Sequence, residues 1–283
     1  MLNAAVLGSP IAHSLSPVLH RSAYRALGLR DWRYAAHEVD EEGFLPFVAG
    51  LDETWRGLSL TMPLKEVAFE VAADISPTAL ATGAINTLVR RETGEWDAHN
   101  TDVHGVVAAL GGGSLQGATD APLSATVLGS GATARSAIAA LAELGVRHVR
   151  LAVRSAVRPA TTRMAADLGL QVEQVSLEDW ADRGGLVVST RPAGAGEAAA
   201  AVLEGHRLEG HRLEGRRLEG TLLDVVYADW PTPLARAAEA AGLTVVSGLD
   251  MLVHQAAEQV RLMTGREAPL QAMLSAGRQA VSR

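Results

Sequence analysis

The chain has 283 residues, 48% of them apolar and 20% charged, the composition of a globular protein long enough to form two domains. Its formal charge of −7 disfavours nucleic-acid binding, and no apolar run approaches the roughly 18 residues that cross a bilayer. The lack of cysteine excludes disulfides, a thiolate nucleophile and a cysteine-built metal site, and the first residues lack the basic stretch of a signal peptide. We therefore expect a cytoplasmic enzyme that contacts neither nucleic acid nor membrane and holds no metal.

The basic residues are unusually uniform. Lys65 is the single lysine, the other 24 basic residues are arginine, and 50 residues of the chain are alanine. This usage is typical of a genome-wide bias and by itself indicates no function.

The first hundred residues alternate short strands with helices, the pattern of a sheet with crossover helices. Ser16, followed by Pro17, is predicted to cap the first helix. The turn at Thr93-Gly94 predicts a hairpin from the last two strands. We expect strands at 3–7, 34–39, 57–60, 85–89 and 96–99, and helices at 41–51 and 64–73.

A second pattern follows the turn-rich stretch 111–123, which predicts a linker or loop. The strand expected at 125–128 runs into Gly129-Ser130-Gly131-Ala132-Thr133-Ala134 and an alanine-rich helix, the order of a Rossmann unit. Such a turn lets backbone N–H groups approach a pyrophosphate, and the helix N-terminus supplies positive potential. Further strands are expected at 148–153, 171–175, 186–189, 222–226 and 244–246, and helices at 249–264 and 270–281.

The end of the second Rossmann strand predicts which nucleotide is bound. An acid here, about 20 residues beyond the glycine turn, would bind the ribose 2′-hydroxyl of NAD. The sequence instead has Arg154 and Arg158 around Ser155, and no acid. Because guanidinium groups suit a 2′-phosphate, we favour an NADP-binding loop over the alternative, a basic loop that is only solvated.

A five-residue repeat, LEGHR LEGHR LEGRR LEG, occupies residues 203–220. On a helix each unit rotates by about 500°, and on a strand an odd period alternates faces, so neither element builds one buried face. We expect a low-complexity surface insertion between two Rossmann strands. A metal or anion site on His206 and His211 is the weaker alternative.

Polar side chains gather where the N-terminal strands are expected to end. They are Ser14 and Ser16, Thr61 and Lys65, Asn86 and Thr87, and Asn100, Thr101 and Asp102. Taken singly, Ser16 and Asp102 are explained as helix caps and Asn86 as a turn residue. Together, the hydroxyls, amides, one amine and one carboxylate suit a polyol, and a lysine beside an aspartate can donate and accept a proton.

These motifs resemble those of the shikimate dehydrogenases, which reduce 3-dehydroshikimate with NADPH. The matching segments are GSPIAHSLSP, TMPLK, GAINTL, NTD, GSGATAR, the Arg-Ser-x-x-Arg turn, Asp-x-x-Tyr…Thr-Pro-Leu at 224–234 and Gly-x-x-Met-Leu-x-x-Gln at 248–255, in the family order over nearly the whole chain.

The resemblance implies an α/β fold of two domains separated by a cleft. A substrate-binding and catalytic domain at 1–102 would be completed by helices at 248–283, and a Rossmann-type NADP-binding domain would occupy 103–247, with the insertion at 203–220. It also implies reversible reduction of 3-dehydroshikimate to shikimate in aromatic amino acid (chorismate) biosynthesis, by a monomer or homodimer.

The resemblance further implies a role for each matching position. Lys65 would be the catalytic acid–base group, held in place by Asp102. Substrate would be bound by Ser14, Ser16, Thr61, Asn86, Asp102, Tyr227 and Gln255, with the two serines at its carboxylate. The cofactor pyrophosphate would lie on Gly129, Ser130, Gly131, Ala132 and Thr133, its 2′-phosphate on Arg154, Ser155 and Arg158, and its nicotinamide near Val225 and Gly248.

The chain departs from the family pattern at three turns. Val153-Arg154-Ser155 stands where Asn-Arg-Thr is usual, Ser59-Leu60-Thr61 where Asn-Val-Thr is usual, and Ser189-Thr190-Arg191-Pro192 replaces an asparagine-rich loop. A quinate/shikimate or related polyol-acid dehydrogenase and a non-catalytic ligand-binding homologue remain alternatives. The intact Lys65 and Asp102 argue against the second.

The acid–base role also explains the single lysine. A guanidinium, with a pKa above about 12, does not release a proton near neutral pH. A bias that replaces lysine by arginine elsewhere is therefore not tolerated at residue 65.

Overall fold

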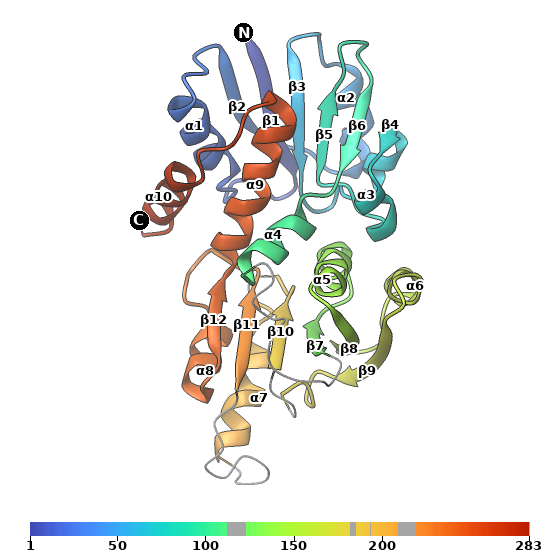
Figure 1. The fold of residues 1–283 in the computed structure, drawn as a ribbon, viewed down its shortest axis with the longest axis vertical. Coiled ribbons are helices and arrows are strands. Elements are labelled where there is room, and N and C mark those ends of the chain that lie inside the picture. The colour runs from blue at the N-terminus through green and yellow to red at the C-terminus, as the bar shows by residue number, and fades with distance from the viewer. Residues whose placement is uncertain (112–122, 182–184, 193, 209–218, 283) are drawn as a thin grey trace. The chain divides into compact units, whose positions relative to one another are not determined.

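The computed structural model describes residues 1–111, 123–181, 185–192, 194–208 and 219–282 (Figure 1). The chain forms two compact units: unit 1 is Met1–Gly105 with Leu252–Arg283, and unit 2 is Val106–Met251. Helices α4 (Asp102–Ala109) and α9 (Gly248–Thr264) each contribute residues to both units. These bounds differ from the expected 102 and 248 by three and four residues.

Unit 1 is built on a mixed six-stranded sheet. In spatial order its strands are β2 (Trp32–Glu38), β1 (Leu2–Gly8), β3 (Trp55–Leu60), β5 (Thr87–Arg90), β6 (Trp96–His99) and β4 (Ala72–Ile75). Its helices are α1 (Ser16–Ala26), α2 (Glu41–Ala49), α3 (Pro77–Thr82), α10 (Leu270–Val281) and the 3-10 helix η1 (Val67–Glu70). The core includes Leu7, Leu58 and Leu88 of neighbouring strands and Phe44 of α2, all 0% exposed.

Two expectations for unit 1 meet opposite outcomes. The hairpin is confirmed, because β5 and β6 pair antiparallel. The helix expected at 64–73 is wrong: η1 covers only its middle, and the following residues form β4, which pairs in parallel with β6. Strand pairing here overrides a local helical pattern.

The start of α1 also differs from the expectation. Leu15 is the N-cap residue and its side chain makes no capping hydrogen bond, while Ser16 is the first residue of the helix, so Ser16 is not the cap. Helix α3 was missed although its signals are present: Ser76 accepts a hydrogen bond from Ala79 N, and Gly83 closes the helix at a φ of 59°.

Unit 2 has the Rossmann topology. Its strands run in the spatial order β12 (Thr244–Ser247), β11 (Gly220–Asp224), β10 (Gly185–Ser189), β7 (Leu123–Leu128), β8 (Val146–Val153) and β9 (Gln171–Ser176), and every pair is parallel. The helices are α5 (Ala132–Glu143), α6 (Pro159–Asp167), α7 (Glu197–Leu208) and α8 (Pro233–Ala241). Numbered along this unit, the order is 6-5-4-1-2-3. After β9 the next strand, β10, is added on the other side of β7, and nucleotides bind at such a switch point between two strands.

The five-residue repeat is only partly described. Its first residues extend α7, and Leu203 is 1% exposed in the core of unit 2, so the expected surface insertion does not begin at residue 203. Residues 209–218, and residues 112–122 of the expected linker, lie outside the described part of the chain.

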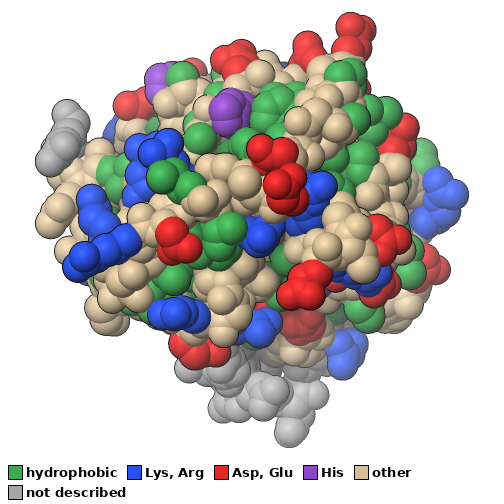
Figure 2. All heavy atoms as spheres, turned by 90° about the horizontal axis from the view of Figure 1, so that it is seen from above, with side chains coloured by type: hydrophobic (Ala, Val, Ile, Leu, Met, Phe, Trp, Pro, Cys, Tyr) green, Lys and Arg blue, Asp and Glu red, His purple; other side chains and the backbone are tan. Residues whose placement is uncertain are grey.

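In the part of the chain that the structure describes, no helix is long and apolar enough to cross a bilayer, and no group of three or more His, Cys, Asp or Glu side chains is placed to hold a metal ion. On the face seen in Figure 2, acidic and basic side chains are interspersed.

His20 of α1 is fully buried, and its ring stacks on Tyr34 of β2 at a centroid distance of 3.9 Å. Burial lowers the pKa of His20 to about 4, and a hydrogen bond between Nδ1 and the Ser16 carbonyl at 2.9 Å opposes this only in part. The ring is therefore neutral in the folded protein at neutral pH. Between pH 4 and 6.5 the unfolded chain binds more protons at this residue, so lowering the pH favours unfolding.

We predict that the free energy of unfolding falls as the pH is lowered from 6.5 towards 4. The contribution of His20 alone is at most roughly 3 kcal/mol. His20→Gln cannot titrate, so its unfolding free energy should depend less steeply on pH than that of the wild type. Urea unfolding at a series of pH values measures both slopes, and equal slopes would contradict the assignment.

Candidate active site

Lys65 and Asp102 form a nearly buried ion pair in unit 1. Lys65 lies in the turn after β3, which is tied to the sheet because the Lys65 carbonyl accepts a hydrogen bond from Ile85 N at 2.8 Å. Asp102 is the first residue of α4. Lys65 Nζ donates to Asp102 Oδ2 at 2.5 Å, and the two side chains are 13% and 7% exposed. The carboxylate thus holds the amine in place.

Asn86 donates a hydrogen bond to the second oxygen of that carboxylate. Its Nδ2 lies 2.8 Å from Asp102 Oδ1, 3.0 Å from Thr101 Oγ1 and 3.1 Å from Gln255 Oε1. Its Oδ1 accepts hydrogen bonds from Thr101 N and Thr87 Oγ1, both at 2.8 Å. The Thr101 hydroxyl also lies 3.3 Å from Gln255 Oε1, and because each of these oxygens has two lone pairs, the cluster can still accept a hydrogen bond from a ligand hydroxyl.

The other hydroxyl residues predicted for this unit follow β1 and β3. Ser16 is 5% exposed, and its N–H donates to Ser14 Oγ at 3.3 Å. Thr61 N donates to Leu7 O at 3.0 Å. Because β1 and β3 are parallel neighbours, these residues follow the same edge of the sheet as Lys65.

The sequence-predicted residues therefore divide into two groups. The structure joins Lys65, Asp102, Asn86 and Gln255 through direct hydrogen bonds. Ser14, Ser16 and Thr61 lie in the same unit without a direct hydrogen bond to those four among the bonds described.

One buried amide was missed. Gln259 is 1% exposed, and its Nε2 donates to Thr87 Oγ1 at 3.0 Å and to Asn86 O at 3.3 Å. Gln255 and Gln259 are four residues apart on α9 and so share one face of the helix. This spacing of two glutamines by four residues was the available signal.

The glycine turn of unit 2 is shaped for a phosphate group. Gly129 follows β7 with a φ of 122°, and a Cβ there would lie 2.5 Å from Thr190 Oγ1, so this position requires glycine. Gly131 is the N-cap of α5, and nothing lies within 4 Å of where its Cβ would be. Thr161 Oγ1 donates to Ser130 O at 2.7 Å and steadies the turn. The open backbone at the N-terminus of α5 is a suitable pyrophosphate site.

The basic turn after β8 is exposed at Arg154, Ser155 and Arg158. Gln174 of β9 braces it: Nε2 donates to Ser155 O at 3.1 Å, and Oε1 accepts from Val157 N at 3.0 Å. Partial burial lowers the pKa of Arg191, and the nearby positive charge of Arg154 lowers it further. Because the positive charges of two guanidinium groups act on each other here, the region suits a phosphate.

The remaining predicted residues of unit 2 follow β11 and β12. A Cβ on Gly248 would lie 2.1 Å from Val225 O, so these two residues are in close contact and position 248 accepts only glycine without rearrangement. Tyr227 is half-buried in the loop after β11.

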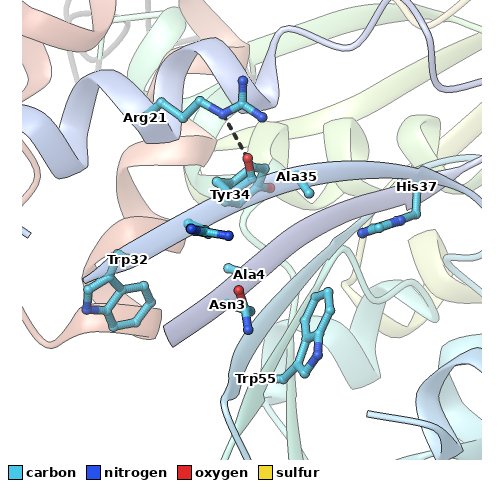
Figure 3. A pocket seen from close by; sticks show the side chains of 9 residues that line it. Asn3, Ala4, Arg21, Trp32, Tyr34, Ala35, His37 and Trp55 are labelled. Atoms are coloured by element: carbon cyan, nitrogen blue, oxygen red, sulfur yellow. Dashed lines mark hydrogen bonds between the residues drawn. The ribbon is translucent and has the colours of Figure 1, made fainter. Parts of the chain in front are cut away.

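A separate pocket of about 510 Å³ lies over β1, β2 and β3 of unit 1 and contains none of the predicted site residues (Figure 3). Its lining includes Trp32 and Trp55, and Arg21 Nε donates across its rim to Tyr34 O at 2.8 Å.

Comparison with known proteins points to one family. Residues 6–88 match the shikimate dehydrogenase substrate binding domain, and residues 248–276 match the shikimate 5′-dehydrogenase C-terminal domain. A curated shikimate dehydrogenase (NADP(+)) from Synechococcus sp. (strain JA-3-3Ab) is 34% identical over 97% of this chain and 92% of that protein.

Solved structures agree over the same length. The crystal structure of Mycobacterium tuberculosis shikimate dehydrogenase is 40% identical, with a TM-score of 0.83 over 99% of both chains. Shikimate 5-dehydrogenase from Thermus thermophilus, in complex with NADP(H) and shikimate, is 34% identical, with a TM-score of 0.81 over 99% of this chain and 100% of that one. With similarity of this extent in sequence and in fold, the chain belongs to the shikimate dehydrogenase family.

Proposed function

We propose that this chain is an NADP-dependent oxidoreductase that reversibly reduces 3-dehydroshikimate to shikimate, a step of aromatic amino acid (chorismate) biosynthesis. The observation that carries the proposal is the Lys65–Asp102 ion pair at 2.5 Å, set among buried amides and hydroxyls. Interconversion of a ketone and a secondary alcohol needs a group that gives and takes back one proton at the oxygen, and a carboxylate-held amine does this.

In the reduction, Lys65 Nζ gives its proton to the carbonyl oxygen of the substrate while a hydride adds to the carbonyl carbon. Bound NADPH supplies that hydride. In the oxidation, the neutral amine takes the proton from the hydroxyl. Asp102 orients Nζ, and the hydrogen bond from Asn86 to the other carboxylate oxygen keeps Asp102 from turning away.

Substrate binding is assigned mainly to unit 1. Ser14 and Ser16 bind the carboxylate as neutral donors, and Thr61, Asn86, Asp102 and Gln255 bind the ring hydroxyls. Tyr227 is assigned to the same substrate. The acceptor capacity around Asn86 supports this part of the proposal, because each substrate hydroxyl brings a donor.

Cofactor binding is assigned to unit 2. The pyrophosphate lies on the turn of Gly129, Ser130, Gly131, Ala132 and Thr133, the 2′-phosphate lies on Arg154, Ser155 and Arg158, and the nicotinamide lies near Val225 and Gly248. The open Cβ position of Gly131 and the paired arginine charges support these assignments. The proposal also includes a cytoplasmic location and a monomeric or homodimeric state.

A spectrophotometric assay with shikimate or quinate, each with NADP⁺ or NAD⁺, tests the proposal. We expect the highest kcat/KM with shikimate and NADP⁺. A preference for quinate would instead indicate a related polyol-acid dehydrogenase. Binding of both ligands without NADPH oxidation by 3-dehydroshikimate would indicate a non-catalytic homologue.

Lys65→Ala and Lys65→Arg should both lower kcat by roughly 10²- to 10⁴-fold, because neither side chain can exchange a proton at working pH. Shikimate binding, followed by calorimetry, should largely persist in both variants. Near-normal turnover in Lys65→Arg would refute the assigned role.

An arginine-to-lysine substitution away from the ion pair of Lys65 and Asp102 supplies a control. Arg91 forms a partly exposed ion pair with Asp97 in the same unit, with Nη2 and Oδ1 2.6 Å apart. Arg91→Lys should leave kcat and KM as in the wild type.

Arg154→Gln should raise the KM for NADPH by about 10-fold or more, since one charge-assisted contact to a 2′-phosphate is lost. The KM for NADH, which lacks that phosphate, should stay nearly constant. Arg147 is also exposed but lies at the opposite end of β8, so Arg147→Gln is the matched control. Equal losses with NADPH and NADH would show that Arg154 contacts another part of the cofactor.

A further inference from the structure

A buried chain of hydrogen bonds begins at Tyr34 of β2. Tyr34 OH donates to Ser59 Oγ at 2.6 Å, and Ser59 Oγ donates to Gln259 Oε1 at 2.8 Å. Gln259 Nε2 then donates to Thr87 Oγ1 at 3.0 Å. All four residues are at most 3% exposed, so no bulk water competes for these bonds.

The chain continues to the ion pair. Thr87 Oγ1 donates to Asn86 Oδ1, and Asn86 Nδ2 donates to Asp102 Oδ1, each at 2.8 Å. Every member thus donates in the same direction, towards an ionised carboxylate. Hydrogen bonds aligned in this way polarise and strengthen one another, and they restrict each side chain to one orientation.

The other end of the chain adjoins the serines after β1. The Tyr34 ring stacks on His20 with the planes 15° apart, and His20 Nδ1 is 2.9 Å from Ser16 O. Burial raises the pKa of Tyr34, while hydrogen bonds with the side chains of Ser59 and Ser16 oppose the rise. Tyr34 therefore contacts the segment assigned to the substrate carboxylate as well as the network assigned to the hydroxyls.

Ser59 is one of the three places where the sequence departs from the family pattern. Its short side chain accepts from Tyr34 and donates to Gln259, so it is the link between the aromatic side chain and the amides. Without Ser59, no hydrogen bond described would connect Tyr34 with Gln259 and the amides beyond it.

We propose that Tyr34 and Ser59 are positioning residues for the substrate: they hold Ser16 and the Asn86 amide in register with each other, so that the carboxylate and the hydroxyls of one molecule are bound together. The inference rests on the proposed function. Because both groups bind the ground state and the transition state alike, loss of register raises the KM for shikimate and leaves kcat nearly unchanged.

The test compares Tyr34→Phe, Ser59→Ala and the double variant. Tyr34→Phe removes one oxygen and leaves the ring stacked on His20 and Ser59 bonded to Gln259. Each single variant should raise the KM for shikimate about 3- to 10-fold, the range given by the net contribution of one hydrogen bond. The kcat and the KM for NADP⁺ should stay within about twofold, because Asp102 keeps its direct hydrogen bonds to Lys65 and Asn86 and unit 2 is untouched.

The double variant distinguishes a connected chain from two separate structural defects. If both residues act through one chain, the double variant should have a KM within about twofold of the weaker-binding single variant. Multiplied effects, an unchanged KM in the single variants, or an equal loss in kcat would each overturn the proposal.

Tyr24 provides a matched control. It is a second buried tyrosine, on α1, whose hydroxyl has no hydrogen-bond partner in the described structure. Tyr24→Phe should leave all kinetic constants as in the wild type, and thermal unfolding of every variant measures any general loss of stability. A wild type inactive with shikimate would refute the proposed function, whereas an active wild type with unaffected variants would refute only this inference.

Discussion

The buried ion pair between Lys65 and Asp102 imposes the strongest constraint on unit 1. Two charges removed from water are tolerated only where the remaining lone pairs and N–H groups are also satisfied. Asp102 meets this requirement through Asn86, and the Asn86 amide in turn requires partners of its own. Each buried polar side chain in turn needs a hydrogen-bond partner, as Thr87 has in Gln259. A core of leucine and phenylalanine therefore contains a layer of polar side chains.

The two units share an arrangement of parallel strands but differ in the groups that their loops present. In each, parallel strands end at one edge of a sheet, and the loops after them carry the assigned site. Unit 1 presents side chains there, and under the proposed function each of these would give one hydroxyl of a polyol its own directed partner. Unit 2 presents backbone N–H groups and guanidinium groups, because phosphate oxygens accept from many directions and carry charge.

The sequence allowed prediction of those elements whose structure depends on neighbouring residues in the chain. Strands β10 and β11 of unit 2 were predictable because strands buried on both faces are apolar runs, and the glycine turn was predictable because Gly129 needs a positive φ. The helix expected around Ala72 failed because pairing with β6 decides that segment. Gln259 was missed because its role depends on Thr87, which lies 172 residues away in sequence. Motif resemblance implied Lys65, Asn86, Asp102 and Gln255 as site residues and the contact of Asp102 with Lys65, but it did not predict the hydrogen bonds from Thr87 and Gln259 behind them.

The discontinuity of unit 1 has a consequence for biosynthesis. Unit 2 is one continuous stretch, whereas unit 1 is closed by residues from Leu252 onward. Domains fold as units while the chain is being synthesised, so unit 2 can fold before the part of α9 that begins at Leu252 has left the ribosome. Lys65 and Asp102 are made early, yet Gln255 and Gln259 arrive among the last residues. The charged pair and Asn86 are therefore made together, whereas the amides of α9 that bond Asn86 and Thr87 join them only in the closing step of folding.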